Sequence, residues 1–132
     1  GLPWRANGIT LASLLKEKIQ ILSDSGCYLV SLGIESFDSS VNTGKNIDIN
    51  NLEEALLELR RCKITSLGFF VTGLENDTYE KSMNTLRKAF DMPFDIILLA
   101  SAVALPGTKL WEYASRNGTF LCSLMRMKGD LF

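Results

Sequence analysis

The chain has 132 residues, of which 46% are hydrophobic and 22% charged, and its formal net charge is −1. This length and balance predict one folded domain or part of one. A charge so close to zero excludes the strong positive field of a nucleic-acid or anionic-membrane surface. The longest apolar run, 96–105, is about half of the ~20 residues that a membrane span requires. No signal peptide is visible, so we expect a cytoplasmic protein without nucleic-acid partners.

The sequence contains no histidine and three cysteines, Cys27, Cys62 and Cys122. Without histidine there is no Ser-His-Asp or Cys-His catalysis and no imidazole-ligated metal. The cysteines are too few and too far apart for a disulfide framework or a Cys-x-x-Cys metal clip, so we interpret them as ordinary thiols. Any catalysis must therefore depend on carboxylates, on a bound cofactor, or on both.

The N-terminal third predicts a strand, a helix and a second strand. Residues 4–8 indicate the end of a strand, and Thr10 is a candidate N-cap. The helix that follows places one apolar stripe on a single side, formed by Leu11, Leu14, Leu15, Ile19 and Leu22. Gly26 is a candidate C-cap. The run 27–34 has so little polarity that it predicts a strand covered on both faces, as in parallel sheets.

The segment 37–50 is rich in Ser, Asn and Asp and carries a lone cation, Lys45. It predicts a loop or a broken short helix. Asn51 followed by Glu54 forms a candidate capping box for the next helix. That helix has basic residues in its last turn, which suits the helix dipole, and an apolar stripe formed by Leu52, Ala55, Leu56 and Leu59.

The next strand is predicted over 66–73, and Asp77 with Glu80 forms a second candidate capping box. We expect the helix after this box to bury one stripe of large side chains, Tyr79, Met83, Leu86 and Phe90. Pro93 ends this helix, and the last strand begins near Asp95.

The dipeptide 106–107 ends the last strand, and Thr108 caps a short helix that stops at Gly118. The remainder, 119–132, has no clear hydrophobic period and is interpreted as a tail or the start of a following segment. Strands and helices alternate through 1–118, with successive strands roughly 30 to 40 residues apart, as in βαβ units. This pattern predicts an α/β fold in which right-handed crossovers make the strands parallel.

Three of the predicted strands end in residues that are typical of a ligand site. In parallel sheets and in (β/α) barrels, ligands bind outside the carboxyl ends of the strands. Glu35 supplies a carboxylate at one exit, Gly73 and Leu74 form a turn at the next, and Leu105 precedes a Pro-Gly turn at the last. We therefore expect these exits to surround one shared mouth.

The motifs at 31–36, 68–74 and 105–112 resemble, in order and rough spacing, those of the radical S-adenosylmethionine enzymes. The resemblance is closest to the branch that often carries a cobalamin-binding domain. It covers about residues 4–118 and implies the C-terminal part of a partial (β/α) barrel of parallel strands with outer helices. The family usually continues the second motif with Pro-Gly, where this chain has Glu75-Asn76.

The resemblance also implies roles for six residues in binding S-adenosylmethionine. Glu35, assisted by Ser36, would bind the ribose, because a carboxylate can accept hydrogen bonds from two vicinal hydroxyls at once. Lys45 would reach the carboxylate or the ribose of the cofactor. The adenine would lie against the chain at two turns, formed by Gly73, Leu74 and Leu105.

A [4Fe-4S] cluster that reduces S-adenosylmethionine to a 5′-deoxyadenosyl radical is the further cofactor that the resemblance implies. The family holds this cluster with Cys-x-x-x-Cys-x-x-Cys, and that motif is absent from these 132 residues. Clusters of this type require thiolate ligands. We therefore expect no metal ligand within this chain, cluster ligands in the N-terminal half of the barrel, and no turnover by this part alone. Cobalamin is a further expected cofactor of the full-length protein.

Two other interpretations stay open at this point. A different parallel α/β module could bind a phosphate or sugar at the same strand ends, which predicts a nest of free backbone amides at a helix N-terminus. A non-catalytic interaction module would instead show an exposed strand edge and bind no cofactor.

Overall fold

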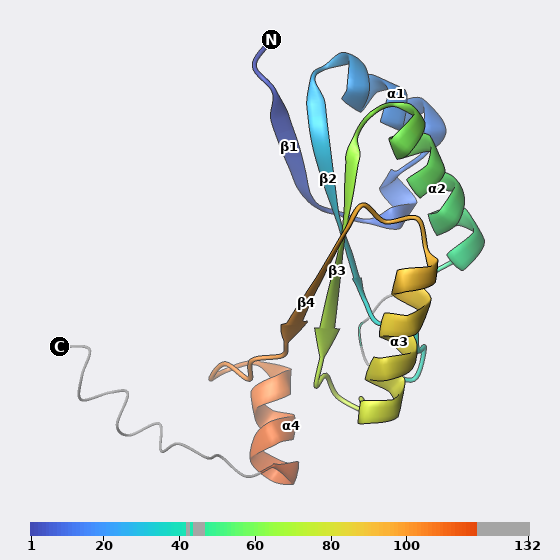
Figure 1. Cartoon of the computed structure of the whole chain (residues 1–132). Helices are drawn as coiled ribbons and strands as arrows, with labels where there is room; N and C mark the ends of the chain where they lie inside the picture. The colour runs from blue at the N-terminus through green and yellow to red at the C-terminus, as the bar shows by residue number, and fades with distance from the viewer. Residues whose placement is uncertain (42, 44–46, 119–132) are drawn as a thin grey trace, which may run out of the picture. The chain divides into compact units, whose positions relative to one another are not determined.

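The computed structural model describes residues 1–41, 43 and 47–118. The chain divides into two compact units, Gly1–Ala102 and Val103–Phe132. The first unit is a parallel sheet with helices, and the described part of the second unit contains helix α4, Lys109–Asn117 (Figure 1). The predicted tail, 119–132, lies outside the described residues. No helix in the described part of the chain is long and apolar enough to cross a bilayer.

Four strands form one sheet in the order β1-β2-β3-β4, and every neighbouring pair is parallel. The strands are β1 Trp4–Ile9, β2 Cys27–Glu35, β3 Thr65–Thr72 and β4 Ile96–Ser101. The predicted α/β fold with parallel strands is thus confirmed. Because each connection moves one strand further in the same direction, the order matches the wall of a (β/α) barrel and not a doubly wound sheet, whose order reverses.

The connecting helices of the first unit all lie on one side of the sheet (Figure 1). They are the short 3-10 helix η1 Leu11–Ser13, α1 Lys16–Asp24, α2 Ile49–Arg61 and α3 Tyr79–Asp91. We call this side of the sheet the helix face and the opposite side the open face. No helix of the described part of the first unit covers the open face.

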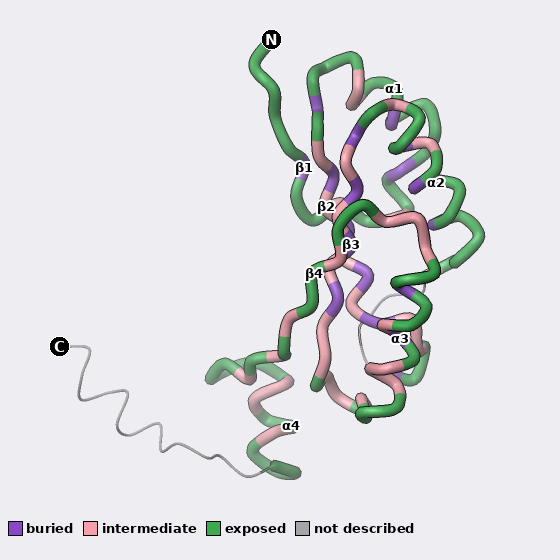
Figure 2. The backbone as a smooth tube through the Cα atoms, in the orientation of Figure 1, coloured by how far each residue is buried: buried purple, intermediate pink, exposed green. Residues whose placement is uncertain are grey.

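The core lies between the sheet and these helices, where the buried segments of β2 and β3 face α1 and α2 (Figure 2). On β2, Val30, Leu32 and Ile34 are at most 1% exposed, whereas the intervening residues are only partly buried. The expectation that this strand is covered on both faces is therefore wrong for the first unit. The alternation shows that β2 has one core face and one open face.

Gly68 on β3 is required by packing. It pairs with Leu32 on the helix face, and a Cβ atom at this position would lie 2.8 Å from the ring of Phe94 and 2.9 Å from that of Phe70. These two rings meet edge to face with centroids 5.8 Å apart. A residue without a side chain is thus what allows the two rings to fill the core over β3.

Helix α1 starts later than predicted. Leu14, with ψ 63, leaves the helical region, so the chain forms η1 first and begins α1 at Lys16. Thr10 shares a 2.9 Å hydrogen bond with the hydroxyl of Ser13 and caps no backbone amide. The Thr10 hydroxyl therefore bonds the Ser13 hydroxyl and not the helix amide that an N-cap would bind.

The two predicted capping boxes are also wrong in position. Asp48 caps α2, accepting from the amides of Asn50 and Asn51 at 3.0 and 3.3 Å. Thr78 caps α3, accepting from the amide of Lys81 at 3.3 Å. In both cases the helix is capped by the side chain at its actual first turn, although a nearby residue has a similar capping propensity.

Helix α3 buries a different stripe from the predicted one. Thr85 and Ala89 are buried, whereas Tyr79 is 80% and Phe90 74% exposed. Small side chains face the sheet because they let the helix approach closely. Both predicted caps of α4 are confirmed in the second unit. Thr108 accepts from the amide of Trp111 at 3.1 Å, and Gly118 is the C-cap.

Candidate functional site

The carboxyl ends of the four parallel strands lie along one edge of the sheet, and their exits are stepped. Strand β1 ends at Ile9, level with Leu32 of β2, and β2 ends at Glu35, level with Phe70 of β3. Strand β3 ends two residues beyond Phe70, at Thr72, and this residue pairs with Ser101, the last residue of β4. Such stepping is the stagger of a barrel wall. The exits of β2 and β3 are therefore neighbours, which places Glu35 and Gly73 on the same edge.

Glu35 sits at a β-bulge with an unusual backbone conformation. Gly33 pairs with Phe69 and Glu35 pairs with the next residue, Phe70, so β2 carries one extra residue here. Glu35 has φ 67, in the left-handed region that favours glycine. Its side chain is half-buried, between the buried residues Ile34 and Ser36. Bulges beside functional sites re-aim a side chain, and such backbone strain concentrates at functional sites.

Ser36 lies on the helix face and its hydroxyl bonds within the protein. It is 3.1 Å from the hydroxyl of Thr85 on α3 and accepts from the amide of Asp38 at 3.1 Å. The amide of Phe37 donates to the same Thr85 oxygen at 3.2 Å. These bonds tie the exit of β2 to α3.

The turn after β3 has the geometry that a Pro-Gly sequence usually provides. The amide of Asp77 donates to the carbonyl of Leu74 at 3.0 Å, and Asn76, third in this turn, has φ 64. A type II turn requires positive φ at its third position, where asparagine is the best substitute for glycine. Glu75-Asn76 therefore preserves the turn that the departure from the family pattern had put in question.

Asp77 holds this turn against the end of β3. Its carboxylate accepts from the amide of Gly73 at 2.8 Å, the amide of Thr78 at 2.8 Å and the hydroxyl of Ser82 at 2.7 Å. Gly73 has φ 78, and no atom lies within 4 Å of the position that its Cβ would occupy. From the sequence alone, Asp77 is predicted only to cap the following helix. The signal that was available is its position, four residues after a strand-exit glycine.

Two further predicted site residues, Leu105 and Lys45, are not among the described residues of the first unit. Leu105 belongs to the second unit, where its carbonyl accepts from the amide of Thr108 at 3.2 Å and from the Thr108 hydroxyl at 2.7 Å. Gly107 has φ 85 within this turn, and Leu105 is exposed. The predicted Pro-Gly turn is thus present. Lys45 lies outside the described residues.

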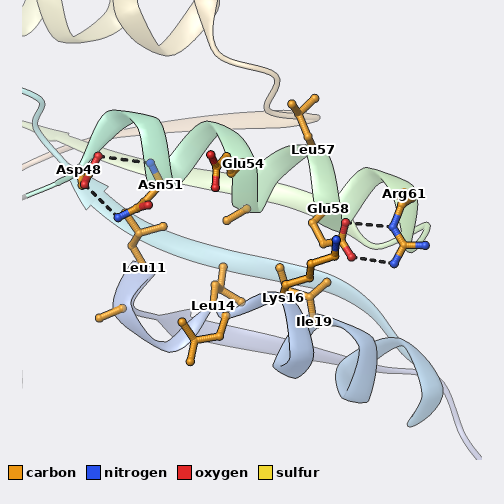
Figure 3. Close-up of a pocket in the computed structure, with 13 residues that line it drawn as sticks. Leu11, Leu14, Lys16, Ile19, Asp48, Asn51, Glu54, Leu57, Glu58 and Arg61 are labelled. Carbon is orange, nitrogen blue, oxygen red and sulfur yellow. Dashed lines mark hydrogen bonds and ion pairs between the residues drawn. The ribbon is translucent and has the colours of Figure 1, made fainter.

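A groove of about 710 Å³ lies elsewhere, along the outer helices. It runs between η1–α1 and α2, with Leu14 and Ile19 on one side and Asp48 and Glu58 on the other (Figure 3). Glu58 is paired with Arg61 through two bonds of 2.9 and 2.7 Å, and these hydrogen bonds lower the pKa of the Glu58 carboxyl. The groove therefore offers apolar packing and a satisfied ion pair, which do not define a chemical centre.

The described cysteines are not arranged as cluster ligands. Cys27 is buried at the start of β2 and Cys62 is half-buried just after α2. Within the described ranges, no group of three or more His, Cys, Asp or Glu side chains could hold a metal ion.

No family model matches the chain. Among curated proteins, an uncharacterized methyltransferase of Pyrococcus horikoshii is 28% identical over 123 residues, which cover 91% of this chain and 26% of that protein. The bacteriochlorophyllide d C-12(1)-methyltransferase of Chlorobaculum tepidum is also 28% identical, over 85% of this chain and 25% of that protein. The chain thus spans about a quarter of the length of these curated relatives.

Solved structures share the fold. Coproporphyrinogen III oxidase of Escherichia coli, a radical SAM enzyme, matches 79% of this chain and 24% of its own, with a TM-score of 0.72 and 17% identity. The radical S-adenosylmethionine methyltransferase TsrM of Kitasatospora setae, solved with cobalamin and a [4Fe-4S] cluster, matches 76% of this chain and 21% of its own. Its TM-score is 0.67 and its identity 14%.

The first unit is therefore an arc of a (β/α) barrel whose strand exits form the candidate site. Its fold is similar to that of these two radical S-adenosylmethionine enzymes, and the resemblance predicted from the three motifs is confirmed at the level of the fold.

Proposed function

We propose that this chain is part of the core barrel of a radical S-adenosylmethionine enzyme and that its strand exits hold S-adenosylmethionine. The observation that carries the proposal is Glu35, a carboxylate presented by a strained bulge at the end of β2. In this proposal Glu35 binds the two ribose hydroxyls, and Ser36 supports it from behind through Thr85. Lys45 binds the carboxylate of the cofactor.

The β3 exit has the properties that an adenine ring needs. The space beside Gly73 is open, and its backbone is held in place by Asp77. A flat ring can therefore approach the chain at Gly73 and Leu74 without meeting a side chain at the glycine. When bound and reduced, S-adenosylmethionine supplies a 5′-deoxyadenosyl radical in this family.

The residues present do not fit a [4Fe-4S] cluster, because such a cluster requires thiolates that converge on one point. Cys27 and Cys62 lie in different elements. We therefore propose that cluster ligands and the remaining barrel strands lie outside these residues, and that this part has no activity alone. For the whole protein we propose methyl transfer with cobalamin, because both curated relatives are named methyltransferases and TsrM was solved with cobalamin.

A phosphate-binding module has less support. Such a site uses free backbone amides at a helix N-terminus. Here one or two first-turn amides of each of α2, α3 and α4 donate to the cap side chains of Asp48, Thr78 and Thr108, whereas α1 has no side-chain cap.

The proposal is tested by replacing Glu35→Gln in the whole protein and measuring its affinity for S-adenosylmethionine by calorimetry. Hydrogen bonds to a charged group are worth enough that we expect affinity to fall roughly 10- to 100-fold. Glu54→Gln, on the outer helix α2, is the matched control and should leave the affinity unchanged. Equal affinity in the Glu35 variant and the wild type would remove this residue from the site.

A further inference from the structure

Glu35 is the central residue of a tight turn that ends β2. The amide of Ser36 donates to the carbonyl of Ile34 at 2.9 Å, and Glu35 between them has φ 67. A hydrogen bond between residues two apart around a positive φ defines the rarer, strained form of the γ-turn. Strained backbone persists only where the surrounding structure fixes it. The groups that hold this turn therefore decide where the Glu35 carboxylate points.

The turn is supported on both sides. On the side of the sheet, Glu35 pairs with Phe70 of β3. On the other side the support comes from Thr85 of α3, whose hydroxyl accepts from the amide of Phe37 at 3.2 Å and lies 3.1 Å from the hydroxyl of Ser36. Thr85 is 5% and Ser36 8% exposed. Water is thus largely kept from these bonds, and without Thr85 two polar groups near the turn would lose their partner.

Helix α3 also holds the exit of β3, and it does so one turn before Thr85. The Ser82 hydroxyl donates to the Oδ2 atom of Asp77 at 2.7 Å, and the amide of Gly73 donates to the same atom at 2.8 Å. Residues three apart in a helix are neighbours on one face. One face of α3 therefore binds both strand exits, and Thr85 is the contact that fixes the β2 exit relative to Gly73.

We propose that Thr85 is a positioning residue, which holds the γ-turn through Ser36 and Phe37 and so aims the Glu35 carboxylate at a ribose. Thr85 acts through these residues and not by contact with the ligand. The inference rests on the proposed function, in which Glu35 accepts from two ribose hydroxyls at once. Hydrogen bonds weaken steeply when their length or angle departs from the preferred range. A turn that is no longer held should therefore lose its grip on the hydroxyl pair.

The test uses the whole protein and two probes, adenosine and 2′,3′-dideoxyadenosine, which lacks both ribose hydroxyls, titrated by calorimetry. We expect the wild type to bind adenosine more tightly by roughly tenfold or more, and Thr85→Val to reduce this preference to less than about threefold. Affinity for the dideoxy probe should stay within about twofold of wild type. Thr85→Ser keeps the hydroxyl and should keep the preference. Thr85→Ala also removes the hydroxyl and replaces Thr85→Val in the test if that variant does not fold.

Ser66→Ala is the matched control. Its hydroxyl is fully buried and donates to Asp95 at 2.8 Å, at the opposite end of the sheet. We expect this variant to have a lower thermal midpoint of unfolding, as Thr85→Val does, and an unchanged preference for adenosine. In a Glu35→Gln background, Thr85→Val should cause no further loss of preference, because both changes act on one carboxylate.

The outcomes separate this inference from the proposed function. A Thr85→Val protein that keeps the wild-type preference would overturn the inference, whether or not its stability falls. A further loss of preference from Thr85→Val in the Glu35→Gln background would also overturn it. A wild type without the preference, or a Glu35→Gln variant that keeps it, would overturn the proposed function and the inference with it. Loss of the preference in Glu35→Gln, together with its retention in Thr85→Val and Thr85→Ala, would overturn the inference alone.

Discussion

Glu35 keeps a backbone conformation that glycine adopts freely and that other residues avoid. Asn76 does the same at the β3 exit, but asparagine tolerates this region well, whereas glutamate has no such advantage. A glycine at 35 would adopt this conformation without the strain.

Replacing Glu35→Gly should therefore separate stability from binding. Relief of strain is partly offset by the greater chain entropy of glycine, so we expect the free energy of unfolding to stay level or rise by up to about 1 kcal/mol. Affinity for S-adenosylmethionine should fall as in Glu35→Gln. Urea denaturation and calorimetry of the whole protein measure both quantities. A loss of more than about 1 kcal/mol would show that Glu35 stabilises the fold.

At the scale of elements, the loop between β3 and α3 is organised by one side chain. Gly73 directly follows the last residue of β3. The Asp77 carboxylate accepts hydrogen bonds from Gly73, Thr78 and Ser82, and so connects this glycine to the start of α3. Lys81 adds a bond from its ammonium to the carbonyl of Asn76 at 2.6 Å. The orientation of the Gly73 peptide thus depends on the helix that follows it.

Replacing Asp77→Ala should release this loop. Losing the three hydrogen bonds should lower the free energy of unfolding by about 1–3 kcal/mol, and hydrogen exchange at the Gly73 amide should become faster. Thr78→Ala is the control, because it removes only the helix cap, worth about 1 kcal/mol, and leaves the Gly73 amide bonded. Unchanged exchange at Gly73 in the Asp77 variant would contradict the proposed role of the aspartate.

At the scale of the whole molecule, the strands β3 and β4 are joined at the opposite end of the sheet by a polar pair, in which Ser66 is buried and Asp95 is exposed. Asp95 accepts from both the amide and the hydroxyl of Ser66 at 2.8 Å, and its own amide donates to the Ser66 hydroxyl at 3.0 Å. Burial raises the pKa of the Asp95 carboxyl, but the bonds from Ser66 and the charge of Arg60, 3.5 Å away, outweigh it and leave the pKa lowered. The strands β3 and β4 are thereby joined where they begin.

This pair makes stability depend on pH. Because the pKa of Asp95 is lower in the folded state, its ionised form stabilises the fold above the unfolded pKa, and this contribution is lost as the pH falls through the folded pKa. We expect Asp95→Asn to be less stable than wild type at pH 7, with a difference that shrinks below about pH 4. Urea midpoints measured from pH 7 to pH 3 test this. A difference that stays constant over the range would show that the charge is irrelevant.

Much of the fold and part of the site follow from local patterns in the chain. The first three strands, the exit residues Glu35 and Gly73, and the Pro-Gly turn before Thr108 were predicted at their observed places, whereas β4 ends at Ser101 and not at the predicted turn. The errors lie in the helix caps, where Asp48 and Asn51 compete for one turn, and in the buried stripe of α3. These errors share one cause, which is that packing against the sheet selects among residues of similar propensity.

By itself the sequence determined the alternation of strands and helices and the turn residues at the strand exits, because these depend on apolar periodicity and on backbone stereochemistry within a few residues. Only the tertiary structure decided that the Ser36 hydroxyl faces Thr85 and that Asp77 holds Gly73. Such facts depend on strand register and on contacts between distant segments, which no local pattern specifies.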